Sequence, residues 1–244
     1  MRLDKNMNTN DTIQKYVALC RNHGVDIHIA LSHGDSCKQK IEGTTITLNA
    51  DIIPESEFEA YLSYNVRKVL VPQLVLTTER LILRRFQQTD AKDCFGFLGD
   101  KQCCYNDGGY EPFDEMDEEY YALMDRFANQ PMRKMIALQS TGKVIGTVNL
   151  MEANDRVVGT YEIGYVISPD YQRKGYAFEA VSALCRSLFD ELHLDMIIAG
   201  AIENNQPSHR LLNKLGFQYE GRKTKSFYHP EYGATDLLYY VKER

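Results

Sequence analysis

The residues best suited to chemistry lie in one stretch of the chain, YEIGYVISPDYQRKGYAFEAVSALCRSLFDEL, at positions 161–192. The pattern predicts a strand, a short basic loop and then a helix that begins at Gly175, because the apolar residues of the later half recur at helical spacing. The first backbone N–H groups of a helix lack partners and carry partial positive charge, so they point into the loop that starts at Gln172. The loop therefore predicts a site for phosphate or pyrophosphate, to which Arg173 and Lys174 add charge.

The spacing of this loop is Q-x-x-G-x-A, ending at Ala177, which differs from the phosphate loops of nucleotide hydrolases and dinucleotide-binding folds. Gly164 lies inside the preceding strand, where glycine often marks a close approach of another backbone or a ligand. We expect the strand to splay there and to leave backbone groups at Val166, Ile167 and Ser168 unpaired. The alternative for Gly175 is a structural turn glycine that contacts no ligand.

A second segment, AIENNQPSHRLLNKLGF at 201–217, predicts a strand followed by a helix. Asn205 is suited to cap that helix at its start, and Gly216 is suited to end it. A capped helix packed by its leucines would explain these residues without a ligand, so a functional role for Asn205 is one of two interpretations.

The two segments together resemble the GNAT superfamily of acyl-CoA-dependent N-acetyltransferases. TERLILRRFQQTDAKD, at 78–93, resembles the first strand and helix of its RimJ/RimL branch, which acts on ribosomal-protein N-termini. The resemblance covers about 77–244 and implies a GNAT-type fold with acetyl-CoA as cosubstrate. It also implies coenzyme A contacts at three places, which are the pyrophosphate loop Gln172, Arg173, Lys174, Gly175, Tyr176 and Ala177, the strand backbone of Val166, Ile167 and Ser168, and the helix residues Asn205 and Ser208.

The reaction implied by the resemblance is direct attack of a primary amine on the thioester in a ternary complex, the amine belonging to a small molecule or a peptide or protein N-terminus. An alkylammonium is mostly protonated at pH 7, so a base is useful, and Glu162 is the candidate. A solvated strand carboxylate is the alternative reading of Glu162. A hydrogen bond from Ser208 would suffice for the departing thiolate, because a thiol is only weakly basic.

One departure from the family pattern keeps a second function open. Many members carry a tyrosine general acid seven residues after the motif asparagine, and this position is Leu212 here. The alternative is therefore a GNAT-like module that binds coenzyme A as a sensor or interaction partner and has lost transfer.

The segment NDGGYEPFDEMDEEYY, at 106–121, is the candidate acceptor surface, because it carries acidic residues, no basic ones and several aromatic rings. Such a set suits a cationic amine through ion pairing and cation–π contact. We select Glu111, Asp114 and Tyr110 from it, with Tyr228 from a later strand. Acidic residues also favour the first turn of a helix, which is the alternative explanation.

Composition and charge limit the remaining function classes. The chain has 244 residues, 43% of them hydrophobic, and a net charge of -6, which argues against a nucleic-acid partner or an anionic membrane surface. The polar start and the lack of a long apolar run lead us to expect a cytoplasmic protein with no membrane contact. His23, His28 and His33 recur every five residues, a spacing that matches neither a helix face nor a strand face, so we expect no metal site, and the six cysteines are expected to be thiols.

The order of elements predicts an α+β fold with a mixed α/β sheet in two parts. Residues 1–76 predict a small α/β unit with helices at 12–22 and 55–69 and strands at 26–31 and 44–48. This unit could cover the acceptor site, mediate a homodimer or stabilise the rest. Residues 77–244 predict the acetyltransferase domain, with the elements that follow: strands at 79–86, 133–139, 143–152, 159–168, 195–203, 217–228 and 235–242, and helices at 89–99, 115–129, 175–193 and 206–215.

Overall fold

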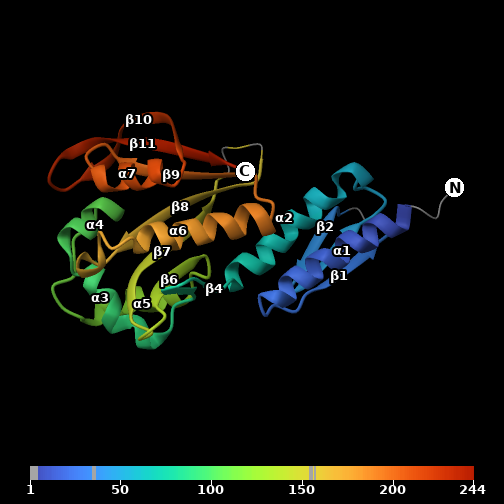
Figure 1. Ribbon diagram of the computed structural model, residues 1–244, viewed down its shortest axis with the longest axis horizontal. Helices are drawn as coiled ribbons and strands as arrows, with labels where there is room; N and C mark the ends of the chain where they lie inside the picture. Colours follow the sequence, from blue (N-terminus) through green and yellow to red (C-terminus); the bar gives the residue numbers. More distant parts are fainter. Residues whose placement is uncertain (1–4, 35–36, 154–155, 157) are drawn as a thin grey trace. The chain divides into compact units, whose positions relative to one another are not determined.

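The computed structural model describes residues 5–34, 37–153, 156 and 158–244. It divides the chain into two compact units (Figure 1). The first is Met1–Leu74 together with Glu191–His193, and the second is Val75–Asp190 together with Leu194–Arg244. Each unit has its own sheet, so each is described by itself.

The first unit is a small α/β unit in which β3 is the central strand, parallel to β1 and antiparallel to β2. Ile46 and Leu48 of β3 are fully buried, as is Leu62 of α2, so the sheet and the helices share one apolar core. The elements are α1 (Lys5–Asn22), β1 (His28–Ser32), β2 (Gln39–Glu42), β3 (Thr45–Asn49), η1 (Glu55–Glu57), α2 (Phe58–Leu70) and η2 (Val71–Gln73).

The described strands of the second unit form one mixed sheet in the order β10-β11-β9-β8-β7-β6-β5-β4. Every neighbouring pair is antiparallel except β8 and β9, which run parallel. The strands are β4 (Leu76–Thr77), β5 (Leu81–Arg84), β6 (Arg133–Leu138), β7 (Val144–Glu152), β8 (Thr160–Ile167), β9 (Met196–Ile202), β10 (Gln218–His229) and β11 (Gly233–Glu243). The helices are η3 (Gln88–Asp90), α3 (Ala91–Leu98), α4 (Lys101–Asp107), α5 (Glu118–Ala128), η4 (Pro169–Tyr171), α6 (Tyr176–Arg186), the π-helical turn η5 (Ser187–Glu191) and α7 (Gln206–Lys214).

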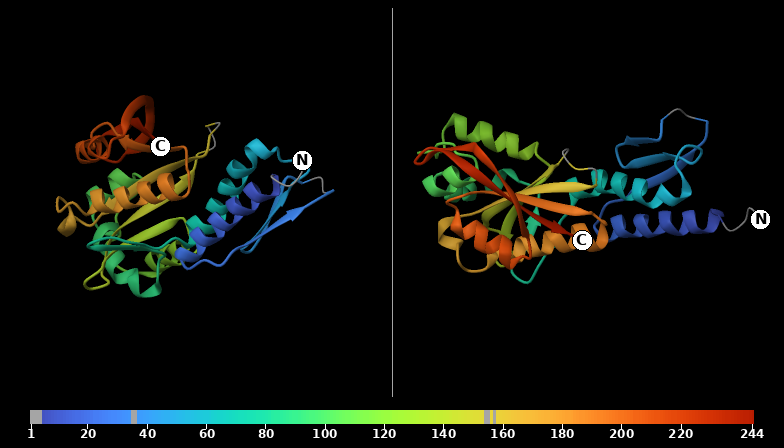
Figure 2. Two further views of the ribbon diagram at one scale, coloured as in Figure 1. Left: turned by 45° about the vertical axis from the view of Figure 1, so that its right-hand side comes forward. Right: turned by 90° about the horizontal axis from the view of Figure 1, so that it is seen from above.

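Helices cover both faces of this sheet. In the right-hand view of Figure 2, α4 and α5 (green) lie on one side of the strands and α6 and α7 (orange) lie on the other. Strand alternation assigns the side chains to these faces: Met135, Thr147 and Val166 are directly opposite one another in neighbouring strands and share the face of α3 to α5. We call this the α3 face and the other the α6 face.

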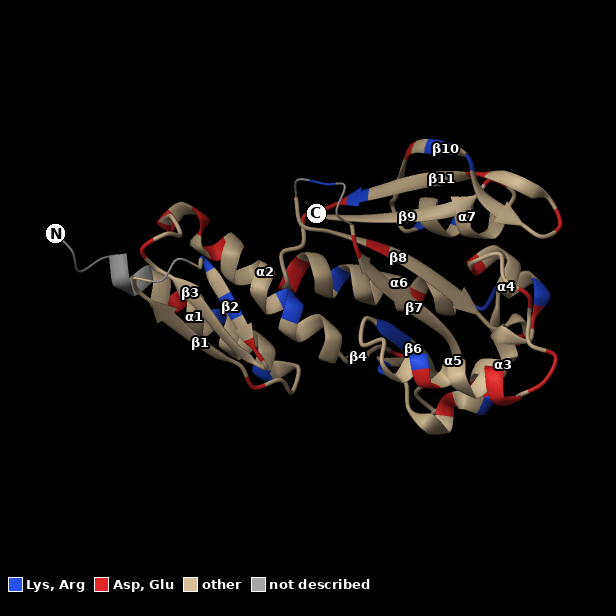
Figure 3. Ribbon diagram, turned by 180° about the vertical axis from the view of Figure 1, so that it is seen from behind, with Lys and Arg blue, Asp and Glu red and all other residues tan. Residues whose placement is uncertain are grey.

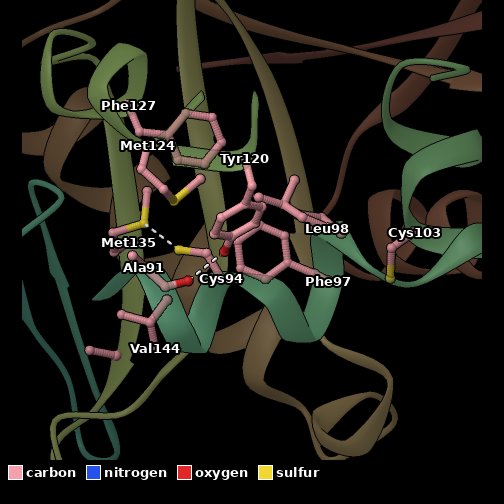
Figure 4. Packing of buried hydrophobic residues seen from close by; sticks show 12 residues of the cluster. Ala91, Cys94, Phe97, Leu98, Cys103, Tyr120, Met124, Phe127, Met135 and Val144 are labelled. Carbon is pink, nitrogen blue, oxygen red and sulfur yellow. Dashed lines mark hydrogen bonds between the residues drawn. The ribbon is translucent and has the colours of Figure 1, made fainter. Parts of the chain in front are cut away.

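A cluster of buried side chains fixes α3 and α5 against the sheet (Figure 4). Tyr120 of α5 is fully buried and donates a hydrogen bond from its hydroxyl to the carbonyl of Ala91 at the start of α3. Cys94 of α3 contacts the Met135 sulfur of β6 across 4.0 Å. This packing makes the α3 face of β6 to β8 a rigid wall.

The predicted fold class, an α+β fold with a mixed sheet, is confirmed. Two predicted helices are shorter than expected: the one expected at 115–129 begins at Glu118, because the Asp117 side chain accepts a hydrogen bond from the Tyr120 N–H and caps it. The one expected at 175–193 is α-helical only to Arg186 and continues as η5. The sequence prediction missed β2, whose QKIE pattern has one apolar residue, and α4, which is mostly polar and is capped by Asp100.

No described helix is long and apolar enough to cross a membrane. The six cysteines are free thiols, five of them buried, while Cys37 is exposed. In the ranges that the structure describes, no three His, Cys, Asp or Glu side chains are grouped so that they could hold a metal ion.

Candidate functional site

The centre of the site is the point where β8 and β9 separate. The two strands pair through only three residues of β8, from Thr160 to Glu162, although β8 continues to Ile167. Ser168 donates its N–H to Ile145 and the Thr160 carbonyl accepts from Ala153, so even-numbered residues of β8 direct their backbone groups to β7. The odd-numbered residues beyond Glu162 therefore direct theirs into the space that β9 leaves.

This alternation decides which backbone groups of Val166, Ile167 and Ser168, the three residues predicted to pair with coenzyme A, face the open side of β8. The groups of Val166 point to its β7 partner Thr147, and the Ser168 N–H is already bonded at 2.8 Å. Of the three, only Ile167 has its N–H on the open side, and Tyr165, which was not selected for its backbone, shares that side. Hydrogen bonding to β7 therefore leaves Val166 and the Ser168 N–H unsuited to this contact.

The loop after β8 leads into α6 through a left-handed turn. Gly175 has φ +83° and is the N-cap of α6, and within the described part of the chain no side chain makes a capping hydrogen bond there. The first bond back to it comes from the Glu179 N–H, so the N–H groups up to Phe178 have no intrahelical partner. Gln172 takes a different role from its neighbours, because its amide donates to the Ile167 carbonyl at 2.9 Å and ties the loop to β8.

Basic side chains surround this helix start, although Lys174 donates to the Asp170 carbonyl rather than toward the helix. The Arg80 guanidinium lies 4.4 Å from the Tyr176 ring and donates to the Lys174 carbonyl at 3.1 Å. It also donates to Glu179 at 2.6 Å. Burial works against ionisation of Glu179, but hydrogen bonds from Thr78 and Arg80 hold the pKa of its carboxyl below the usual value. Free N–H groups, a glycine in the left-handed region and cations together fit an anionic pyrophosphate.

The start of α7 borders the same opening. The Asn205 side chain accepts from the Ser208 N–H at 3.2 Å, so it acts as the helix N-cap. The Tyr165 hydroxyl lies near Ser208, and its oxygen is buried without a hydrogen bond of good geometry in the described residues. Burial raises the pKa of this phenol to about 12, with Ser208 opposing the shift. The phenol is therefore protonated at every physiological pH.

A hollow of about 270 Å³ opens where the strands part. Glu162 lies on the α3 face of β8 and lines the hollow. Tyr165 also contributes to the lining, although strand alternation directs its side chain to the α6 face. The residues lining it are Asn106, Asp107, Arg133, Thr147, Asn149, Met151, Glu162, Ile163, Gly164, Tyr165, Gly200, Ala201, Ile202, Phe227 and Leu237.

Two glycines shape the hollow beside Glu162. A Cβ at Gly164 would meet nothing within 4 Å, so this position leaves open floor. A Cβ at Gly200 of β9 would lie 3.5 Å from the Glu162 carboxylate and 3.1 Å from Leu237. The tight approach at position 200 is therefore to Leu237, while the Glu162 carboxylate lies at ordinary contact distance from this position.

None of the residues selected for the acceptor lines this hollow. Glu111 accepts a hydrogen bond from Tyr105 at 2.9 Å, and Asp114 is exposed on the loop before α5, where Figure 3 shows red segments. Tyr110 donates to Asp107 at 2.9 Å, and Tyr228 is 69% exposed. The acidic segment instead contributes Asp107 to the hollow and Asp117 to the cap of α5.

The sequence reasoning missed Arg133, Asn149, Phe227 and Leu237, which reach the hollow from β6, β7, β10 and β11. Their alternation within each strand was readable, but the strand order that brings them together was not. A second hollow of about 370 Å³ lies beside α6, lined by Phe178, Cys185 and Lys214 among others. It contains neither Glu162 nor the backbone released by β9, so we assign the chemistry to the first hollow.

Comparison with known proteins finds relatives in sequence and in fold. Residues 80–218 match the family model described as the acetyltransferase (GNAT) domain. YnaD of Bacillus subtilis (strain 168), named an uncharacterized N-acetyltransferase, is 33% identical over 149 residues, covering 60% of this chain and 84% of the relative. The ribosomal protein uS5-alanine N-acetyltransferase of Escherichia coli (strain K12) is 27% identical over 171 residues, covering 62% and 81%. An acetyltransferase structure of the GNAT family from Bacillus anthracis superposes with a TM-score of 0.62 at 27% identity, covering 70% of this chain and 98% of that one.

Proposed function

The chain belongs to the GNAT acetyltransferase family and is an acetyltransferase, and on that premise we propose that it acetylates a primary amine of a small molecule or a peptide N-terminus. The observation that carries the proposal is the early end of β8–β9 pairing at Glu162, with a hollow beside Glu162 and open β8 backbone that leads along the chain to the start of α6. One strand thus connects the proposed amine site to the proposed anion site.

Acetyl-CoA supplies an acetyl group activated as a thioester. The N–H groups at the start of α6, with Arg173 and Lys174, bind its pyrophosphate. The Ile167 N–H and the Tyr165 backbone groups pair with the extended pantetheine as a β9 strand would have done. Asn205 supports this contact indirectly, because it caps α7 and fixes Ser208.

Glu162 accepts the proton that the incoming ammonium must lose before its nitrogen lone pair can attack the carbonyl carbon. The new C–N bond forms as the C–S bond breaks, and the electron pair of that bond leaves on sulfur. The nitrogen then loses a second proton, which neutralises the thiolate and gives free coenzyme A thiol. Tyr165 and Ser208 lie together on the other side of β8, where their hydroxyls stabilise the departing thiolate. Tyr165 thereby replaces the tyrosine general acid of the family pattern, whose position in this chain is occupied by Leu212.

Free thiol release from acetyl-CoA, measured across a panel of primary amines, tests the proposal. We expect release that depends on the amine and is stoichiometric with acetylated product. Tight coenzyme A binding without release for any amine would favour the alternative, a coenzyme A sensor or interaction module. A homodimer stays a separate proposal, which sedimentation of the purified chain would test.

A further inference from the structure

Arg133 is a cation in the hollow whose charge the protein leaves available. Its Nε donates to Gln130 at 2.9 Å and its guanidinium lies 4.4 Å from the Phe127 ring. These contacts fix the plane of the group, while its two terminal nitrogens make no hydrogen bond or ion pair among the described residues. Arg133 is half-buried, and this burial lowers the pKa of its guanidinium.

The sheet register places Arg133 on the same face of the sheet as the candidate base. Arg133, Asn149 and Gly164 are directly opposite one another on β6, β7 and β8 and share the α3 face. With strands about 4.8 Å apart, the Cα atoms of Arg133 and Gly164 are roughly 10 Å apart. Glu162 is two residues further along β8 on the same face, so the acid and the cation approach the hollow from two sides with the open floor of Gly164 between them.

Asp107, the other acidic residue lining the hollow, does not satisfy the guanidinium. Its carboxylate accepts from Tyr110 at 2.9 Å, and it forms no ion pair with Arg133 in the described structure. The negative charge of Asp107 still stabilises the charged form of Arg133, and so opposes the lowering of its pKa by burial. The planar fork of an arginine is matched best by carboxylate or carbonyl oxygens.

We propose that Arg133 binds an oxygen of the acceptor, so that the preferred acceptor carries a carboxylate or carbonyl group near its amine. Amino acids and peptide N-termini have this chemistry, and polyamines lack it. The inference rests on the proposed function, since it assigns the second end of the acceptor whose amine faces Glu162. Arg133 is a positioning residue and takes no proton.

The test uses the full chain with three matched acceptors, alanine, alaninamide and isopropylamine, and with spermidine. We expect measurable transfer to alanine or alaninamide with a KM about tenfold or more below that of isopropylamine. The better of the two oxygen-bearing acceptors shows whether a carboxylate or a carbonyl is preferred.

Arg133→Met keeps the aliphatic stem on Phe127 and removes the charge. We expect it to raise KM for the oxygen-bearing acceptors about 10- to 100-fold, to leave kcat nearly unchanged and to leave isopropylamine unaffected. Arg133→Lys should recover part of the loss, and the exposed Arg126→Met should behave as the unmodified chain. Unchanged thermal unfolding and coenzyme A affinity establish that the variants are folded.

Two results overturn the inference while the proposed function stands. One is that isopropylamine or spermidine is the best acceptor, and the other is that Arg133→Met lowers turnover of all acceptors alike. Absence of transfer to any amine would instead remove the proposed function, and this inference with it.

Discussion

At the scale of single residues, β8 carries a carboxylate and a phenol on its opposite faces. Because β9 leaves β8 after Glu162, the β8 backbone between these two side chains is open. In the proposed mechanism the amine loses a proton to Glu162 while Tyr165 stabilises the leaving sulfur. The two groups therefore make separable contributions.

Replacing Glu162 by glutamine is expected to lower kcat/KM about 100-fold at pH 7, because the amide accepts no proton from the ammonium. The defect should shrink as pH rises toward the pKa of the free amine, since deprotonated amine then binds directly. The pH–rate profile of amine-dependent thiol release measures this. Glu152→Gln, an exposed carboxylate at the end of β7, is the matched control, and an unchanged profile for Glu162→Gln would exclude Glu162 as the base.

Tyr165→Phe removes only the buried hydroxyl and is expected to lower kcat about 10- to 100-fold. Because the pKa of this phenol is raised to about 12, the loss should be nearly constant from pH 6 to roughly pH 10. Single-turnover kinetics measures the chemical step, and Tyr219→Phe, 57% exposed on β10, is the control. Equal rates for the two variants would remove Tyr165 from the chemistry.

At the scale of elements, the start of α6 combines backbone geometry with charge. Gly175→Ala should weaken coenzyme A binding about tenfold, because the added Cβ would lie 3.4 Å from the Arg80 guanidinium beside the helix start and the φ of +83° strains alanine. Gly142→Ala is matched in strain, with φ +73°, but a Cβ there meets nothing within 4 Å. Calorimetric titration with coenzyme A should therefore separate the two variants, and equal affinities would show that the loop does not hold the pyrophosphate.

Strand β6 carries a second test at this scale. Lys134 is 1% exposed, and burial, with the nearby Arg85 adding to it, lowers the pKa of its ammonium to about 7. Between pH 7 and roughly pH 10 the unfolded chain then binds more protons than the folded one, so the lysine's destabilising contribution falls as pH rises. The Tm of Lys134→Met relative to that of the unmodified chain should be highest near pH 7 and should decline toward pH 10. A difference in Tm independent of pH would contradict the lowered pKa.

At the scale of the whole molecule, the first unit is not a continuous piece of chain. It includes Glu191–His193, the last residue of η5 and the two residues after it. Leu192 is fully buried, and its carbonyl accepts from the Ser63 hydroxyl and from Arg67, each at 2.9 Å. Deleting residues 1–74 would therefore remove most of the first unit but leave Leu192, part of its buried core, in the remaining chain.

Arg67→Met is expected to lower the free energy of unfolding by about 1–3 kcal/mol, because buried oxygens lose a charged donor. Arg21→Met, whose side chain is 72% exposed, should change it by less than about 0.5 kcal/mol. Urea unfolding followed by circular dichroism measures both. If the two variants unfold alike, these hydrogen bonds do not stabilise the unit.

Local sequence carried much of the fold. Alternation and helical spacing located most strands and helices of the second unit, and failed where side chains carry little pattern, as in β2 and α4. The helix that begins after Gly175 and the capping role of Asn205 were readable because both depend on neighbouring residues alone. The acidic segment has a local explanation in part, since Asp117 caps the start of its own helix, and its role toward an acceptor stays a prediction.

The sequence by itself determined the phosphate-type loop, the capped helix and the family resemblance, because each is written in adjacent residues at fixed spacing. The tertiary structure decided which strands lie beside each other, and with that the opening between β8 and β9 after Glu162. It also decided that Arg133 shares this space, although it lies 29 positions from Glu162. Such contacts depend on sheet register and strand order, which arise from long-range pairing that no local pattern records.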